Sequence, residues 1–168
     1  MASIIRHYKI YLTGPAPFAD LDVHTDTPQF LDPYAIRLLG APTPHAVKAI
    51  SCLNTFLDEL VLTAVSSDPA TQTRGAALPV FPEPRQTRLG LSVRGINGHG
   101  GAEVIRRRIW KAMSTDLQPL LHVGVLRHLE ELGFYIKDVG DDVTSDITTR
   151  IIFQALVDFT QEMLTLYP

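Results

Sequence analysis

The chain has 168 residues, of which 45% are hydrophobic and 20% charged, and its formal net charge is −3. This composition excludes a disordered chain, and the length suits a single domain over residues 1–168 with its own core. The weak negative charge excludes a global field that would attract nucleic acid or an anionic membrane, so any basic patch must be local.

The first predicted element is a strand at residues 7–12. Aromatic and aliphatic side chains alternate there with polar ones, and Thr13, Gly14 and Pro15 stop the pattern. Residues 16–27 lack periodicity and predict a loop that leads into a short extended piece.

Two helices follow, each opened by a capping residue and a proline. Asp32-Pro33 predicts the start of a short helix that Gly40 ends. Thr43-Pro44 repeats the signal before apolar residues at three- and four-residue steps, which predict a long helix over about residues 44–66. Its wide apolar face indicates packing on a sheet or between two layers.

The middle of the chain predicts a loop and two strands. Residues 66–77 are rich in Ser, Thr and Ala without a clear apolar face, which favours a flexible loop. Residues 78–81 and 88–93 predict strands, and prolines end the first of them.

The second half of the chain is mostly helical in this interpretation. Residues 101–114 and 115–131 predict helices, the second interrupted at Gly124, and the first carries basic residues mostly opposite its apolar side. Residues 134–139 predict a strand, and Ser145-Asp146 predicts the cap of a last helix that reaches Tyr167. The expected fold is therefore α/β (α+β), a helix-rich single domain with a small mixed sheet.

A glycine-rich loop lies directly before the basic helix. Glycines allow close backbone approach, and a helix N-terminus presents unpaired N–H groups to an anion. We therefore expect Gly98, Gly100 and Gly101 to admit a phosphate, with His99 as a candidate catalytic group for proton transfer. The spacing matches neither the dinucleotide fingerprint nor a Walker loop, so a turn without a ligand is the alternative.

The basic helix supplies candidate phosphate ligands. Helical spacing brings Arg107, Arg108 and Lys111 near one another, where they could neutralise several phosphates together. Solvated surface charge is the alternative interpretation, because no aromatic residues are interleaved as in a platform for single-stranded nucleic acid.

Four aspartates lie between residues 138 and 146. Carboxylates suit Mg²⁺, so Asp141 and Asp146 are candidate metal ligands and catalytic residues of metal-assisted phosphodiester hydrolysis. Such a site needs a carboxylate from elsewhere, for example Glu83 or Glu103. Ordinary turn and helix-cap chemistry is the alternative.

Four short motifs carry a family resemblance. They are Thr-Pro-Gln-Phe-Leu-Asp-Pro at residues 27–33, Leu-Gly-Leu-Ser at 89–92, Gly-His-Gly at 98–100 and Ser-Asp-Ile-Thr-Thr at 145–149. Together they resemble an uncharacterised bacterial protein family associated with phage-defence and toxin-type loci. The resemblance implies a defence-like context and assigns no reaction.

The localisation expected is cytoplasmic, without a membrane. The chain has a single cysteine, so no intramolecular disulfide can form, and this favours a reducing compartment. The N-terminus lacks the apolar stretch of a secretory signal, and no later run is long and apolar enough to span a bilayer.

Two functional hypotheses follow. The leading one is a protein of a defence-like system that binds nucleic acid or nucleotide phosphate, with a Mg²⁺-dependent phosphodiesterase as its enzymatic form. The alternative is a non-catalytic protein-interaction module, or a subunit of a larger complex or homo-oligomer, that docks through an apolar helix face. The first requires the Asp-rich turn to lie beside the loop around His99.

Overall fold

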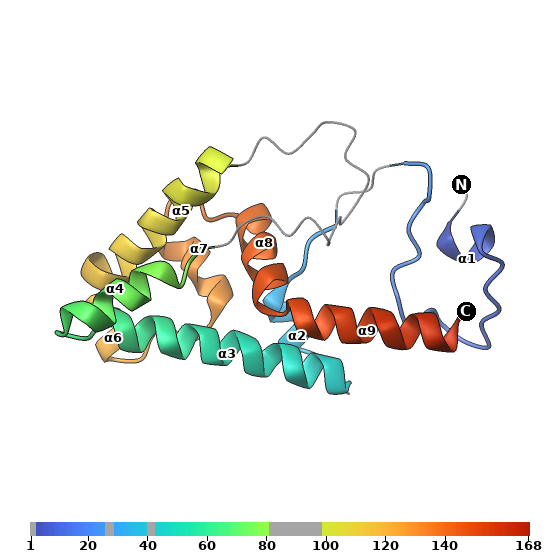
Figure 1. Ribbon diagram of the computed structural model, residues 1–168, viewed down its shortest axis with the longest axis horizontal. Helices are drawn as coiled ribbons and strands as arrows, with labels where there is room; N and C mark the ends of the chain where they lie inside the picture. Colours follow the sequence, from blue (N-terminus) through green and yellow to red (C-terminus); the bar gives the residue numbers. More distant parts are fainter. Residues whose placement is uncertain (1–2, 26–28, 40–42, 81–98) are drawn as a thin grey trace.

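The computed structural model describes residues 3–25, 29–39, 43–80 and 99–168, with the backbone alone at 99–102. The described residues form helices and no strand (Figure 1). The elements are α1 Ile4–His7, α2 Pro33–Arg37, α3 Pro44–Ala64, α4 Pro69–Ala77, α5 His99–Lys111, η1 Ala112–Asp116, α6 Gln118–His122, η2 Leu129–Glu131, α7 Leu132–Tyr135, α8 Asp141–Ile151 and α9 Phe153–Leu166. The expected α/β (α+β) fold with a mixed sheet is therefore wrong, and the class is all-α.

The strand predicted at residues 7–12 is replaced by the end of α1 and a turn. Lys9 has a φ of 55°, which no strand residue adopts. Tyr11 is 86% exposed, so the alternating pattern has no buried face to stabilise a strand. An isolated antiparallel bridge between Ser3 and Asp22 is the extended pairing that the described part of the chain contains.

The strand predicted at residues 134–139 is also wrong. The chain leaves α7 at Tyr135 and enters a turn in which Asp138 has a φ of 67°. Of the strand predicted at residues 78–81, Leu78 and Pro79 form the turn after α4. The strand predicted at residues 88–93 lies outside the described residues.

The helix starts marked by a capping residue and proline are confirmed. Asp32 accepts a hydrogen bond from the backbone of Tyr34 at 2.8 Å, and Thr43 accepts one from Ala46 at 3.2 Å. The loop predicted at residues 66–77 is wrong, because Asp68 caps α4 in the same way. Composition favoured a loop there, whereas the cap and proline favour a helix.

The helices of the second half differ from the predicted boundaries. The stretch predicted at residues 115–131 begins within η1 and continues as α6 and η2, and the interruption predicted at Gly124 is confirmed, because this residue lies between them with a φ of 65°. The last helix begins at Asp141, so Ser145-Asp146 is not its cap. It is also broken at Ile152, where α8 ends and α9 begins.

Helix α3 is the centre of the packing. It contacts α2, α4, α8 and α9, and Leu60 on its inner face is fully buried against the core. The core cluster of the described residues runs in sequence from Ala49 to Ala155. Lys48 pairs with Asp158 at 2.6 Å and His45 pairs with Glu162, so these two contacts join the N-terminal end of α3 to α9.

Helix α4 approaches α3 and α5 closely at Gly75. A Cβ atom at this position would lie 2.3 Å from Thr63 Oγ1 and 2.5 Å from Trp110 Cη2. Only glycine fits this approach, which positions α5 against the rest of the core. Figure 1 shows α4 and α5 together at one end of the molecule, with α1 and the end of α9 at the other.

Candidate functional site

The helix predicted to begin at Gly101 begins earlier in the structure. Helix α5 begins at His99, so Gly100 and Gly101 belong to its first turn. Gly98 and the side chain of His99 lie outside the described part of the structure. The phosphate-binding role of the glycines and the proton-transfer role of His99 therefore stay predictions.

The arginines of α5 are held by carboxylates of the same chain. Arg106 donates to Glu103 at 2.7 Å and to the carbonyl oxygen of Ala76 at 2.7 Å. Arg107 donates to the same Glu103 carboxylate at 2.8 Å. Arg108 forms an ion pair with Asp138.

The pKa of Glu103 reflects its hydrogen bonds with Arg106 and Arg107. Hydrogen bonds from Arg106, and then from Arg107, lower the pKa of Glu103 to about 2. Its carboxylate therefore stays ionised far into the acid range and neutralises part of the helix charge. Lys111 is exposed and makes no ion pair with any described residue. Unlike Arg107 and Arg108, it could therefore bind a phosphate without leaving a described carboxylate partner.

The Asp-rich turn does reach the basic helix, but through Asp138. The predicted metal ligands Asp141 and Asp146 both lie on α8, where a separation of five residues places them about 140° apart around the helix. Glu103, one suggested partner carboxylate, is engaged by the two arginines, and Glu83 lies outside the described residues. Within the described residues, no three His, Cys, Asp or Glu side chains gather as metal ligands.

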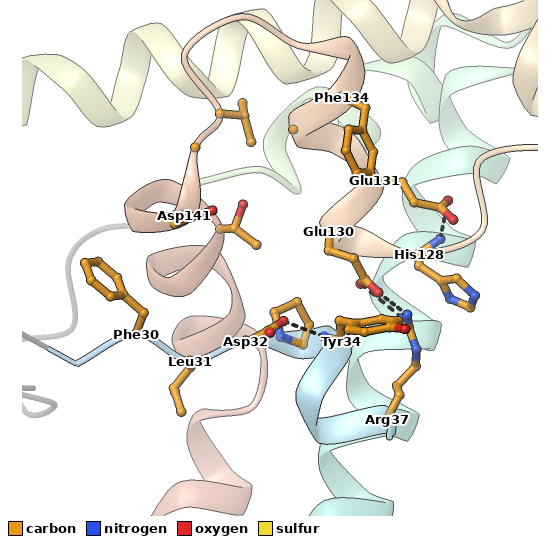
Figure 2. Close-up of a pocket in the computed structure, with 15 residues that line it drawn as sticks. Phe30, Leu31, Asp32, Tyr34, Arg37, His128, Glu130, Glu131, Phe134 and Asp141 are labelled. Atoms are coloured by element: carbon orange, nitrogen blue, oxygen red, sulfur yellow. Dashed lines mark hydrogen bonds and ion pairs between the residues drawn. The ribbon is translucent and has the colours of Figure 1, made fainter. Parts of the chain in front are cut away.

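The structure contains a pocket that the sequence did not predict as a site. It encloses about 790 Å³ between α2 and the segment from η2 to the start of α8 (Figure 2). Asp141 is the one predicted catalytic or metal-ligating residue that lines it. The lining residues are Phe30, Leu31, Asp32, Pro33, Tyr34, Arg37, His128, Glu130, Glu131, Gly133, Phe134, Val139, Gly140, Asp141 and Thr144.

One wall of the pocket is fixed by a contact between segments remote in sequence. The backbone N–H of Leu31 donates to Ser145 Oγ on α8 at 2.9 Å. Ser145 is buried, so this bond attaches the extended segment before α2 to the core. Pro33 is buried at the start of α2, where Asp32 caps the helix, and this arrangement positions Tyr34 at the pocket.

The opposite wall is held by two glutamates. Glu130 and Arg37 form an ion pair in which Arg37 Nη1 lies 3.0 Å from Glu130 Oε2, and both side chains are mostly buried. Glu131 accepts hydrogen bonds from the backbone N–H groups of Arg127 and His128, at 2.7 and 3.0 Å. Figure 2 shows the bonds of Glu130 with Arg37 and of Glu131 with His128, and these contacts give both carboxylates structural roles.

The pocket rim is aromatic and acidic. Phe30, Tyr34 and Phe134 are 56%, 52% and 84% exposed, although each lines the pocket. Asp141 is exposed and makes no hydrogen bond or ion pair with any described residue. The lining offers exposed aromatic side chains and a carboxylate without an ion pair to any described residue, a combination that suits recognition of a ligand more than proton transfer between paired groups.

The described residues define an all-α protein with a pocket of aromatic and acidic side chains. Residues 13–168 match a domain family of unknown function, DUF8370, and the chain belongs to that family. The expectation of an uncharacterised family is thus confirmed, whereas bacterial origin and a defence context stay predictions. The comparison with curated proteins and the comparison with solved structures each found no match.

The structure also bears on the prediction that no segment spans a membrane. None of the helices in the described ranges is both long enough and apolar enough to cross a bilayer. The cytoplasmic location stays a prediction.

Proposed function

We propose that the protein is a non-catalytic interaction module that binds a partner protein through the pocket between α2 and α8. The observation that carries the proposal is the exposure of Phe30, Tyr34 and Phe134 around a single concavity. Exposed apolar patches of this kind on a folded chain typically mark interaction sites. Aromatic residues are also the usual anchors of protein interfaces, because each contributes a large contact area with few rotatable bonds.

The roles of the pocket carboxylates support binding without catalysis. Glu130 is paired with Arg37, Glu131 accepts two backbone N–H groups, and Asp32 caps α2. Each of these carboxylates therefore already has a partner within the fold. A general acid and base, in contrast, would need to exchange protons with a bound substrate.

The nucleic-acid hypothesis has less support. Arg106, Arg107 and Arg108 already have carboxylate partners, and a phosphate would have to displace them. The pocket itself would repel a phosphate, because the charged groups of its described lining that have no ion pair with a described residue are acidic. A Mg²⁺-dependent phosphodiesterase would further require ligands beyond Asp141 and Asp146, which the spacing on α8 separates.

The test is selection of peptides on the full-length chain. A random peptide library is panned on the immobilised protein, and enriched peptides are titrated by fluorescence anisotropy against the wild type and Phe134→Ser. We expect the substitution to weaken binding about tenfold or more, since an interface anchor is removed. The fold should persist, because the Phe134 side chain is mostly exposed.

The matched control is Tyr11→Ser. Tyr11 is as exposed as Phe134 and does not line the pocket, so this variant should bind the same peptides as the wild type. Failure to enrich any peptide whose binding depends on Phe134 would overturn the proposal. Binding of DNA or RNA at low salt that is lost on substitution of Lys111 would favour the nucleic-acid hypothesis instead.

A further inference from the structure

The pocket has a strong charge bias. Among the described residues, its lining contains four carboxylates, Asp32, Glu130, Glu131 and Asp141, and one arginine, Arg37, a formal charge of −3 with histidine counted as neutral. A concave site with charge of one sign concentrates its field and attracts ligands of the opposite sign. The ligand that the pocket attracts is therefore a cation.

Among the described residues, three of the four carboxylates lack a cationic partner, and two of these three, Asp32 and Asp141, are also largely free of hydrogen bonds. Arg37 neutralises Glu130, and Glu131 is engaged by two backbone N–H groups. Asp32 accepts only the N–H of Tyr34, at 2.8 Å, and Asp141 has no hydrogen bond or ion pair with any described residue. Both side chains are exposed, so an incoming cation can reach them without breaking an ion pair with any described residue.

The start of α8 does not offset this bias. The N-terminus of a helix carries a partial positive charge that favours anions. Here Asp141 and Asp142 occupy the first turn, so two full negative charges stand at that end. The pocket side of α8 therefore remains acidic.

Aromatic surfaces lie beside these carboxylates. In Figure 2, Phe30 and Asp141 lie on the left of the pocket, and Phe134 and Tyr34 lie on the right. A cation next to an aromatic face gains further attraction from the ring, and an aliphatic or aromatic side chain beside it would cover the exposed rings. The chemistry of the pocket thus matches a ligand that is basic and apolar within a short span.

We infer that the partner contributes a segment in which a lysine or arginine stands beside a large apolar side chain. The cation is attracted by the carboxylates of Asp141 and Asp32, and the apolar side chain covers part of the aromatic rim. This inference rests on the proposed function, because it names the chemistry of the partner at the same pocket.

The experiment compares two charge removals one residue apart. Peptides enriched on the full-length chain are titrated against Asp141→Asn and Asp142→Asn. Both substitutions remove one charge from the first turn of α8, but only Asp141 lines the pocket. We expect Asp141→Asn to weaken binding about tenfold and Asp142→Asn to change it by less than about twofold.

The peptide sequences and the salt dependence give independent readouts. Enriched peptides should carry a lysine or arginine within two positions of a large apolar residue. Replacing that basic residue by glutamine should weaken binding to the wild type about tenfold and have little effect on binding to Asp141→Asn. Added salt should weaken wild-type binding more than binding to the variant.

The outcomes separate this inference from the proposed function. Neutral or acidic peptides that require Phe134, with equal affinity for Asp141→Asn and the wild type, would overturn the inference and leave the interaction module standing. The absence of any Phe134-dependent peptide would overturn the proposed function itself. Equal weakening by Asp141→Asn and Asp142→Asn would also contradict the inference, since it would indicate a general charge effect.

Discussion

Helix α5 and the pocket are both rich in charged residues, but the two regions differ in how many of these residues have ion-pair partners. On α5, Glu103 holds Arg106 and Arg107, and Asp138 holds Arg108. At the pocket, Asp141 is exposed without a partner among the described residues, beside aromatic rings that are more than half exposed. A run of like charges in a sequence therefore does not identify a binding surface until the ion-pair partners of those residues are known.

The two regions also differ in how deeply their large apolar side chains are buried. Trp110, Ile109 and Met113 anchor α5 and η1 in the core, whereas Phe134 projects from α7 with 84% of its surface exposed. Burial makes α5 part of the scaffold, and exposure leaves the pocket rim available to a ligand. Each of the following substitutions tests whether α5 is part of the scaffold as described.

The largest effect should come from the buried face of α5. Ile109 is 1% exposed, so Ile109→Ala should lower the free energy of unfolding by about 2–5 kcal/mol through lost burial and a residual cavity. Urea titration followed by circular dichroism measures the change. Val104→Ala on the same helix is the control, and its cost should stay below about 1 kcal/mol because Val104 is 47% exposed, against 1% for Ile109. A similar cost for both variants would show that α5 is not anchored as described.

Local signals in the sequence predicted the helix starts that depend on neighbouring residues alone. Asp32-Pro33 and Thr43-Pro44 supply a side-chain cap and a proline whose missing N–H is harmless, and both helices begin there. Asp68-Pro69 supplies the same signal for α4, which was missed because the Ser- and Thr-rich composition favoured a loop. The capping chemistry was the better guide.

Contacts between remote segments determine what the sequence could not predict. The strand expected at residues 134–139 is prevented by the positive φ of Asp138, whose side chain pairs with Arg108 from α5. The pocket depends on Leu31 meeting Ser145 and on Arg37 meeting Glu130, pairs separated by 114 and 93 positions. Periodicity and capping report on neighbouring residues only, so neither pair leaves a local signal.

A smaller effect should appear where α5 meets the turn that borders the pocket. Arg108→Ala and Asp138→Asn form a double-mutant cycle on this exposed ion pair, and we expect a coupling of about 0.2–1 kcal/mol in unfolding free energy. Asparagine tolerates the positive φ of Asp138, so the substitution changes mainly the charge. Arg107→Ala with Asp138→Asn is the control cycle, where the coupling should be close to zero because Arg107 pairs with Glu103.

The smallest effect should be the pH dependence of the charges on α5. The pKa of Glu103 in the folded chain is about 2, below its ordinary value of 4.5, because Arg106 and Arg107 donate to it. A lowered folded pKa stabilises the fold above the unfolded value, so the wild type should melt above Glu103→Gln at pH values over 4.5. That difference should shrink as the pH falls from 4.5 and disappear near pH 2, because protonation removes the charge that the arginines bind. Melting temperatures across the acid range measure it, and the difference should lose its pH dependence when Arg106 and Arg107 are both alanine. A difference that persists below pH 2 would show that Glu103 stabilises α5 by packing, and the arginines would then be freer to bind phosphate than their ion pairs indicate.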